Sequence, residues 1–355
     1  MAKINKHIEI VRASRSGLSS MSQLSCDAIL AVLERHYVAV GVTIINRAAD
    51  LDILAAQQPD VVFLGMKFVP ASETSSLGDS AKIWLTDYLD SQSISYTGSS
   101  GKAHELERDK ALAKQCVLAA GLATSPYRVV RRGQLEALRE TSLNFPLFVK
   151  PTNRGGGVGV DAASVVRNIE ELNIKISSIS ARLQADSLVE QYLPGREFSV
   201  AILRDELSAE LALMPLELIA PMGKRGARLL SSRVKSSNSE LAIEVTDQSV
   251  KAMVTTLALQ VFQALGARDY GRIDIRLDGA GWPHFLEANL LPSLISGYGS
   301  FPKACQLNLQ LDHEQMILAI TSLALTRSAS QHYDGDDQPE MVVRPAALAR
   351  LSQPV

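Results

Sequence analysis

The sequence predicts an α/β protein in three domains, with an α+β arrangement in its C-terminal part. Its 355 residues, 46% of them hydrophobic, are enough to form more than one packed unit. Strand-like and helical runs alternate through residues 1–98, which is typical of a parallel sheet flanked by helices. Late in the chain, the turn Asp278-Gly279-Ala280-Gly281 separates two strand-like runs and predicts an antiparallel hairpin.

Residues 1–98 are expected to form the first domain, a small parallel α/β unit. Short β-branched runs predict strands at residues 8–11, 40–45 and 61–64. Apolar residues at helical spacing predict a helix over residues 22–36.

Residues 99–187 are expected to form the second domain. A charged helix is predicted from residue 104 to residue 120, and Gly121 is expected to end it. Further elements are predicted as strands at residues 127–130 and 146–150, a polar helix over 134–140, a strand from Val158, and a helix that ends before Ser187.

Residues 188–327 are expected to form the third domain. Strands are predicted at residues 188–191, 197–203, 270–277 and 284–288, with a basic loop over 223–239 and a helix over 247–265. The polar and acidic residues 328–355 are expected to form a mobile tail.

Composition excludes several classes of partner. The chain has 36 Lys+Arg and 38 Asp+Glu, so its net charge of -2 gives no long-range attraction for nucleic acid or anionic lipid. We therefore expect neither a nucleic acid nor a membrane partner. Cys26, Cys116 and Cys305 are odd in number and widely spaced, which indicates a reducing compartment rather than a disulfide framework. No apolar run of signal-peptide length follows the start, so a cytoplasmic protein is expected.

A glycine-rich loop follows a predicted strand that ends in Lys150. Backbone N–H groups at Gly155, Gly156 and Gly157 can approach an anion closely, and Lys150 supplies a positive charge for phosphate. The alternative is an ordinary tight hairpin loop, because glycine patterns often occur without a ligand.

A second cluster surrounds the Pro194-Gly195 turn. Glu190 and Glu197 lie on either side of this turn and could contact the amino group of an adenine and a ribose. The alternative is an exposed strand-turn-strand segment.

The third cluster lies on the predicted hairpin. With a period of two, Arg272 and Asp274 share one face of a strand, and Glu287 and Asn289 share one face of its neighbour. Asp, Glu and Asn oxygens suit Mg²⁺ bound together with nucleotide phosphates, and an arginine can stabilise an oxyanion. The alternative, a surface charge ladder, fits poorly with the apolar neighbours of these residues.

The fourth cluster is Asp109-Lys110, with Lys114 one helical turn further on. Lysines on helices are usually exposed and solubilising, so only the position of this cluster relative to the others gives it weight.

Taken in order, these clusters resemble the ATP-grasp superfamily, and in particular the D-alanine–D-alanine ligase family. The resemblance covers residues 95–303 and includes Tyr96-Thr97-Gly98-Ser99, Asp109-Lys110, Phe148-Val149-Lys150-Pro151, Gly271-Arg272-Ile273-Asp274 and Glu287-Ala288-Asn289-Leu290-Leu291-Pro292. It implies a three-domain ATP-grasp fold, in which an N-terminal α/β domain precedes two α+β domains that clamp ATP. It also implies a homodimer formed through the first domain.

The resemblance implies a role for each matching residue. Lys110 and Lys150 would hold the ATP phosphates beneath a lid that contains Gly155, Gly156 and Gly157. The adenosine would contact Glu190, Gln191, Leu193 and Glu197. Two Mg²⁺ ions, with Mn²⁺ as an alternative, would be bound by Asp274, Glu287 and Asn289. The catalytic residues would be Arg272, Lys235 and Ser293.

The implied reaction joins a carboxylate to an amine. The carboxylate attacks the γ-phosphate of ATP to give an acyl phosphate and ADP, and an amine of a second amino-acid-like substrate then expels phosphate. Lysines and Mg²⁺ reduce the repulsion between the two anions of the first step. A closed lid keeps water from the acyl phosphate.

The chain departs from the family pattern at the expected substrate positions. Ser20 replaces an acidic residue, Ser293 replaces a glycine, and Lys67 stands near a position where these ligases often have His. Arg12 and Arg15 lie in the same loop region as Ser20, so we hypothesise that Arg12, Arg15 or Lys67 meets an anionic group of the substrate. The alternative is that these side chains are exposed to solvent.

Three functions are therefore compatible with the sequence. The first is amide-bond formation between amino acids, as in D-alanine–D-alanine ligation. The second is the same chemistry on a different, anionic substrate of natural-product assembly. The third is a catalytically silent ATP-binding protein that regulates a partner, although such a protein has no need of Arg272 together with the complete metal-binding group.

Overall fold

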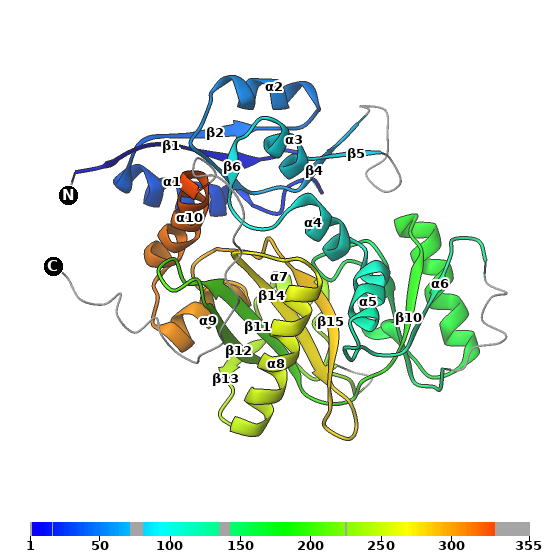
Figure 1. The fold of residues 1–355 in the computed structure, drawn as a ribbon. Helices are drawn as coiled ribbons and strands as arrows, with labels where there is room; N and C mark the ends of the chain where they lie inside the picture. The colour runs from blue at the N-terminus through cyan, green and yellow to red at the C-terminus, as the bar shows by residue number, and fades with distance from the viewer. Residues whose placement is uncertain (1, 16, 72–80, 135–142, 224–225, 331–355) are drawn as a thin grey trace.

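The computed structural model describes residues 2–15, 17–71, 81–134, 143–223 and 226–330 (Figure 1). The helix expected over residues 134–140 and most of the expected tail lie outside these residues. Within the described ranges, no helix combines the length and the apolar character that a membrane span requires.

The first sheet is parallel, with the strand order β2-β1-β3-β6. Its strands are β1 (Ile4–Arg12), β2 (Tyr37–Ile44), β3 (Val61–Leu64) and β6 (Ser95–Tyr96), and its helices are α1 (Gln23–His36), α2 (Ala49–Ala56) and α3 (Leu85–Ser91). The central strands are buried on both faces because helices cover both sides of the sheet (Figure 1). The predicted parallel α/β unit is confirmed. A small hairpin of β4 (Phe68–Pro70) and β5 (Lys82–Trp84) was not predicted, since three-residue strands leave little periodicity.

The single helix expected from residue 104 to residue 120 is wrong. The structure has two helices, α4 (Gly101–Arg108) and α5 (Lys110–Ala119). Asp109 between them is extended, with φ -101° and ψ 102°, and its carboxylate accepts hydrogen bonds from the amides of Ala111 and Leu112. Asp109 therefore caps α5 and places Lys110 in the first turn of a new helix.

The second sheet has the strand order β7-β10-β8-β9. It consists of β7 (Tyr127–Val130), β8 (Leu147–Pro151), β9 (Val165–Val166) and β10 (Ser187–Gln191), with η2 (Ala162–Ser164) and helix α6 (Ile169–Leu183). The strand expected from Val158 is wrong, because residues 155–159 form successive turns and Gly156, Gly157 and Gly159 have positive φ.

The third sheet is antiparallel, with the strand order β13-β12-β11-β14-β15. Its strands are β11 (Glu197–Arg204), β12 (Leu211–Ile219), β13 (Leu241–Glu244), β14 (Tyr270–Leu277) and β15 (Pro283–Asn289), and its helices are α7 (Ser232–Ser236) and α8 (Gln248–Ala264). The predicted β14–β15 hairpin is confirmed. Strands β12 and β13 were not predicted; Pro215 interrupts the sequence signal of the first, and β13 is a short edge strand.

Helices α9 (Ser300–Leu309) and α10 (His313–Ser330) connect the first and third segments. The main hydrophobic cluster includes Ile10 of β1, Met214 of β12, and Ile317 and Ile320 of α10. Figure 1 shows α10 beside α1 and β6, far in sequence from both. Because α10 continues to Ser330, residues 328–330 are helical and the expected start of the tail at residue 328 is wrong. The division into three domains stays a prediction.

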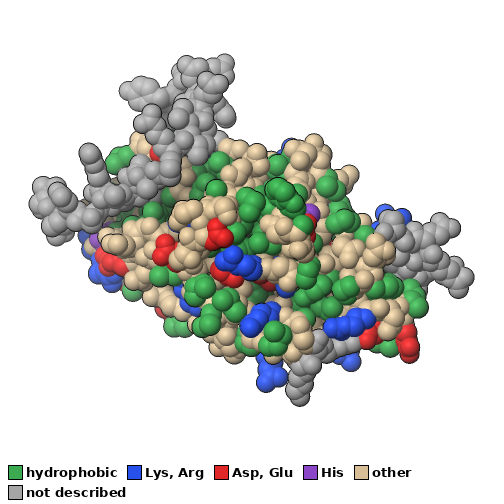
Figure 2. All heavy atoms as spheres, turned by 90° about the horizontal axis from the view of Figure 1, so that it is seen from below, with side chains coloured by type: hydrophobic (Ala, Val, Ile, Leu, Met, Phe, Trp, Pro, Cys, Tyr) green, Lys and Arg blue, Asp and Glu red, His purple; other side chains and the backbone are tan. Residues whose placement is uncertain are grey.

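The lower face of the molecule carries charges of both signs among apolar side chains (Figure 2). This interspersion agrees with the net charge of -2 for the whole chain.

Candidate active site

Two adjoining cavities lie where the second and third sheets meet. The larger has a volume of about 1260 Å³ and reaches residues of the first segment, such as Ser20 and Lys67. The smaller, of about 80 Å³, has apolar walls that include Phe148 and Leu193. Both are lined by Lys110, Arg154, Val158, Leu230, Lys235, Asp274 and Glu287. The two cavities thus meet at a group of charged side chains.

The β14–β15 hairpin brings together the four polar residues expected there. Arg272 lies opposite Asn289, and Asp274 lies opposite Glu287. The guanidinium of Arg272 is 3.4 Å from the Asp274 carboxylate. The amide of Asn289 is satisfied when its oxygen accepts from Arg272 Nη2 at 3.2 Å and its nitrogen donates to the Leu291 carbonyl. These side chains therefore form one polar group on the cavity wall.

The hydroxyls of Ser199 and Ser300 also belong to this polar cluster. Ser199 Oγ donates to Asp274 Oδ1 at 2.7 Å and lies 3.2 Å from Ser300 Oγ. Ser300, at the start of α9, accepts a hydrogen bond from Arg272 Nη1 at 2.5 Å. Sequence reasoning gave Ser300 no role, because no regular spacing links α9 to the hairpin.

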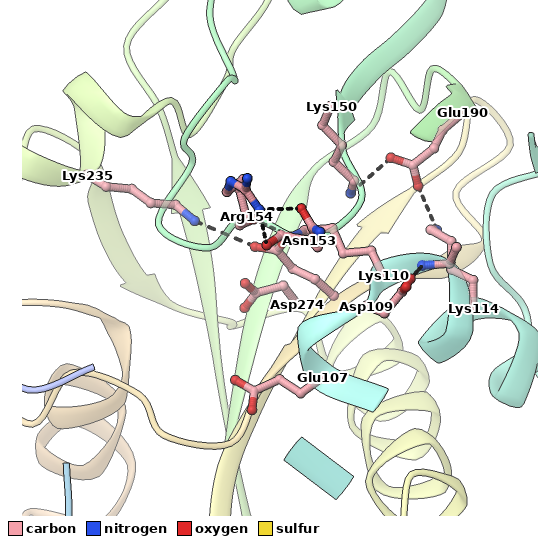
Figure 3. Close-up of polar contacts among 12 residues, drawn as sticks. Glu107, Asp109, Lys110, Lys114, Lys150, Asn153, Arg154, Glu190, Lys235 and Asp274 are labelled. Carbon is pink, nitrogen blue, oxygen red and sulfur yellow. Dashed lines mark hydrogen bonds and ion pairs between the residues drawn. The ribbon is translucent and has the colours of Figure 1, made fainter. Parts of the chain in front are cut away.

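Three lysines from different segments lie close to two glutamates, buried Glu190 and half-buried Glu287. Figure 3 shows Lys150 directed at Glu190. Lys110 and Lys235 each lie 3.8 Å from Glu287, and Lys150 lies 2.9 Å from Glu190. Burial by itself would raise the pKa of Glu287, but the lysines and Arg272 hold it far below its usual range. Both glutamates are therefore anionic near neutral pH, and the lysines are arranged around them.

Lys114 is buried, contrary to the expectation of an exposed helical lysine. Its side chain has 0% exposure, and its ammonium lies 2.7 Å from Glu190. Burial lowers the pKa of Lys114 to about 8, and the nearby Lys150 adds to this effect, whereas Glu190 opposes it. Helical periodicity alone could not reveal this burial, because β15 and β10 cover the residue only in the folded chain.

The glycine-rich loop lies over the junction of the two cavities. Gly155 and Gly156 line the larger cavity and Gly157 the smaller. A Cβ atom on Gly157 would lie 2.7 Å from the backbone nitrogen of Ser232, so the loop packs closely against the N-terminus of α7. Lys110 Nζ also donates to the carbonyl of Arg154, at 2.5 Å, which ties the base of the loop to α5.

The residues expected around adenosine line the smaller cavity. Leu193 is buried. Gln191 Oε1 accepts from the backbone amide of Asn144, and Gln191 Nε2 donates to the carbonyls of Asn144 and Pro146. Glu197 forms an ion pair with Arg276 at 3.0 Å. Burial nevertheless raises the pKa of Glu197 above its usual value. Arg276, which sequence reasoning missed, also lies over the ring of Tyr192.

Ser20, Ser293 and Lys67 line the opposite end of the larger cavity. The ammonium of Lys67 is 2.6 Å from Glu107, whose other oxygen is 3.1 Å from the Nδ1 atom of buried His104. Glu107 also lines the cavity and was not expected. A carboxylate, that of Glu107, therefore lines the same cavity as Ser20 and Lys67.

The structure does not bring Arg12 and Arg15 to the two cavities, and their contact with an anionic group of the substrate stays a prediction. Neither belongs to the described residues that line the two cavities. Arg12 Nη1 donates to Gln23 at 2.6 Å, and Arg15 is exposed. The turn at Gly17 and Leu18 reaches the cavity in their place.

A family model described as "D-ala D-ala ligase C-terminus" matches residues 116–321, which is more than half of the chain. The chain belongs to this family. The predicted recognition is therefore confirmed, and with it the enzyme class, an ATP-grasp ligase, at the level of the family.

This member of the D-alanine–D-alanine ligase family is similar in sequence to several other proteins. A D-alanine–D-alanine ligase of Glaesserella parasuis is 34% identical over 62% of this chain and 69% of its own length. Another, from Geobacter sulfurreducens, is 28% identical over 81% of this chain and 84% of its own length. The uncharacterised protein y4sG of Sinorhizobium fredii is 30% identical over 58% of this chain, and the match spans 60% of y4sG, less than two thirds.

Solved structures confirm the fold. Two crystal structures of the D-alanine–D-alanine ligase of Bacillus anthracis, one complexed with ATP, superpose with TM-scores of 0.67 and 0.70. Each covers 92% of this chain and 99% of the ligase, at 20% identity. The family member described here therefore has the predicted ATP-grasp fold.

Proposed function

We propose that this protein is an ATP-dependent carboxylate–amine ligase that joins amino-acid-like substrates through an acyl phosphate. The observation that carries the proposal is the meeting of Lys110, Lys235, Arg272, Asp274 and Glu287 on the wall of one cavity. These residues come from α5, the α7 segment and the β14–β15 hairpin, so the fold gathers them at one place.

In the first step a substrate carboxylate attacks the γ-phosphorus of ATP and ADP leaves. Two anions approach each other in this step, so positive charge that is already in position lowers the barrier. Lys110 and Lys150 would bind the phosphates, and Lys235 would approach from the α7 segment. The smaller cavity beside Leu193 would hold the adenine, and Glu197 the ribose.

In the second step the amine attacks the acyl carbon, and the acyl C–O bond breaks as phosphate leaves. Negative charge develops on the acyl oxygen, and the guanidinium of Arg272 would stabilise it by a charge-assisted hydrogen bond. Ser300 holds this guanidinium at 2.5 Å, while the neighbouring Ser293 lines the same wall. The glycine-rich loop would exclude water from the acyl phosphate.

The hairpin fits Mg²⁺ by its chemistry. Asp274, Glu287 and Asn289 offer hard oxygen donors, and Mg²⁺ is usually held by one or two carboxylates together with substrate phosphates. Among the described residues there is no group of three or more His, Cys, Asp and Glu side chains that could hold a metal ion. Mg²⁺ bound at the hairpin, as one or two ions, would neutralise phosphate charge, and Mn²⁺ is the alternative.

The substrate end favours an amino-acid-like molecule other than D-alanine in the first position. Ser20 lines the cavity where an acidic residue is expected, and the Lys67–Glu107 pair presents both charges to the cavity. Such a pair can bind a zwitterionic or anionic group.

The test is a substrate panel with the purified full-length chain. Mg²⁺-ATP and pairs of D- and L-amino acids are incubated with the protein, and phosphate release and the amide product are measured, the latter by mass spectrometry. We expect phosphate release that depends on an added amino acid and is lost in Asp274→Asn. ATP binding without any such release across the panel would instead support the regulatory function.

The proposal also includes a homodimer in the cytoplasm. The homodimer is supported by the edge strand β2, where Val38 is 57% and Ile44 39% exposed. Light scattering of the wild type and of Val38→Glu tests it, because the charge should shift the mass toward the monomer.

A further inference from the structure

Lys114 lies behind the smaller cavity rather than in it. Its neighbours Glu190 and Ser125 line that cavity, whereas Lys114 is not one of the described residues that do. A group in this position cannot touch a bound nucleotide. Its effect on the site must pass through the residues that it contacts.

The Lys114 ammonium has four partners. It donates to Thr124 Oγ1 at 2.6 Å, to the Phe285 carbonyl at 3.2 Å and to Ser125 Oγ at 3.4 Å, and it lies 2.7 Å from Glu190 Oε1. An ammonium has three donors, so these partners engage all of them. The partners belong to the α5–β7 loop, β15 and β10, so the position of the charge is set by tertiary structure.

Glu190 divides its two oxygens between two lysines. Oε1 faces Lys114, and Oε2 lies 2.9 Å from Lys150. In the β8–β10 register Lys150 pairs with Leu188 and Glu190 with Phe148, so the two charged residues are diagonal neighbours on one face of the sheet. Figure 3 shows Glu190 between the two lysines.

We propose that Lys114 is a positioning residue of the nucleotide site, which acts through Glu190 to hold the Lys150 ammonium at the cavity wall. The inference rests on the proposed function, because Lys150 is assigned there to the ATP phosphates. Lys114 balances the charge of one Glu190 oxygen. The charge of Lys150 is therefore not fully neutralised by Glu190 and can still attract a phosphate.

The charge of this trio supports the inference. Two lysines and one glutamate carry a net charge of about +1, which falls to about 0 when Lys114 is replaced by methionine. Buried charge groups stabilise a fold poorly compared with apolar packing, so stability alone gives little reason for this arrangement. Attraction of a phosphate does give one.

The test measures Mg²⁺-ATP affinity by calorimetry, and the KM for ATP and kcat by ADP release. For Lys114→Met we expect affinity about tenfold weaker and a correspondingly higher KM, with kcat at saturating ATP within about twofold of the wild type. Lys175→Met is the matched control, since Lys175 is also buried and paired with Asp161 at 2.8 Å, away from both cavities. It should bind Mg²⁺-ATP like the wild type.

A double variant distinguishes a positioning role of Lys114 from its contributions to the net charge of the trio and to the stability of the fold. Lys114→Met with Glu190→Gln restores the net charge of the trio to about +1 and leaves no unpaired buried carboxylate. We expect its resistance to urea to recover while its ATP affinity remains weak. Recovery of both would overturn the inference, because Lys114 would then serve only charge balance.

The remaining outcomes are also decisive. Wild-type affinity in a folded Lys114→Met overturns the inference, whereas failure of the wild type to bind ATP overturns the proposed function instead. If Lys114→Met does not fold, Thr124→Val removes one acceptor of the ammonium without changing charge. Affinity about threefold weaker in that variant supports the inference, and unchanged affinity rejects it.

Discussion

Glu107 is a buried carboxylate that two neighbouring groups keep ionised. Burial by itself would raise its pKa, but Lys67 and His104 bring the pKa down to about 2 from its ordinary value of 4.5. Because the folded-state pKa is depressed, the ionised group stabilises the fold above about pH 4.5, and this contribution is lost as the pH falls toward 2. Burial keeps the pKa of His104 below its ordinary value, so its ring is neutral near pH 7.

Removal of Lys67 should therefore destabilise the protein in a pH-dependent way. We expect Lys67→Met to lower the free energy of unfolding by about 3 kcal/mol at pH 7, since it leaves a buried carboxylate without its cation. The difference from the wild type should narrow at pH 3, where Glu107 becomes protonated in the variant. Urea unfolding at both pH values measures this, and an equal difference at both would contradict it.

Arg272 tests the proposed chemistry at a single side chain. Its guanidinium contacts Ser300 and Asp274 together, and a lysine cannot make both contacts in the same plane. Arg272→Lys should reduce kcat about 100-fold with little change in the KM for ATP, as expected when an oxyanion loses its donor. Arg196→Lys, at the exposed pair with Glu217, is the control and should retain kcat. A retained kcat in Arg272→Lys would remove this residue from the mechanism.

The sequence predicted which residues form the polar group of the site better than it predicted which side chains are buried. Asp274 and Glu287 were recognised because alternation along a strand determines which side chains share a face. The burial of Lys114 and the contribution of Ser300 were missed, since both depend on elements that are distant in the sequence.

The glycine-rich loop and α7 pack closely against each other. Gly157 has φ +75°, and a Cβ atom there would meet the Ser232 backbone at 2.7 Å, whereas a Cβ atom on Gly155 would meet nothing within 4 Å. We expect Gly157→Ala to raise the KM for ATP about tenfold, because the strained loop and the displaced α7 segment no longer close over the phosphates. Gly155→Ala is the matched control and should stay within about twofold of the wild type. Equal KM values in steady-state kinetics would contradict this account.

Most elements were predicted close to their observed bounds, with informative exceptions. The break at Asp109 was missed because an Asp side chain inside a helical pattern is compatible with both a helix and a cap. Strands β12 and β13 were missed because they are recognised mainly by their pairing with β11 and with each other. The hairpin of β14 and β15 was predicted because its turn residues carry a local signal.

At the scale of the whole molecule, α10 joins the end of the described chain to its beginning. Arg327 Nη1 lies 2.9 and 2.7 Å from the two oxygens of buried Asp269, and Nη2 donates to the Tyr96 carbonyl. Asp269 also accepts from the backbone amide of Gly98 at 3.1 Å. The first sheet, the start of β14 and the last helix therefore meet at one carboxylate.

Arg327→Met should lower the free energy of unfolding by about 3 kcal/mol, because the buried carboxylate of Asp269 loses its cation. Arg35→Met, which breaks an exposed pair with Glu314, should change it by less than about 1 kcal/mol. Urea unfolding of both variants measures the difference. Similar values for the two variants would mean that α10 is held by apolar packing alone.

From the sequence alone, the family, most of the elements and the residue types of the polar group on the β14–β15 hairpin could be predicted. These follow from local periodicity, turn residues and motifs at compatible spacing. Only the folded chain shows which charges are buried and which side chains face the cavity: Lys114 lies behind Glu190, Lys67 pairs with Glu107, and Arg12 and Arg15 do not line the cavities. Burial and pairing could not be predicted because they arise from contacts between elements that are distant in the sequence. A net charge of -2 therefore conceals a cavity wall on which opposite charges are concentrated.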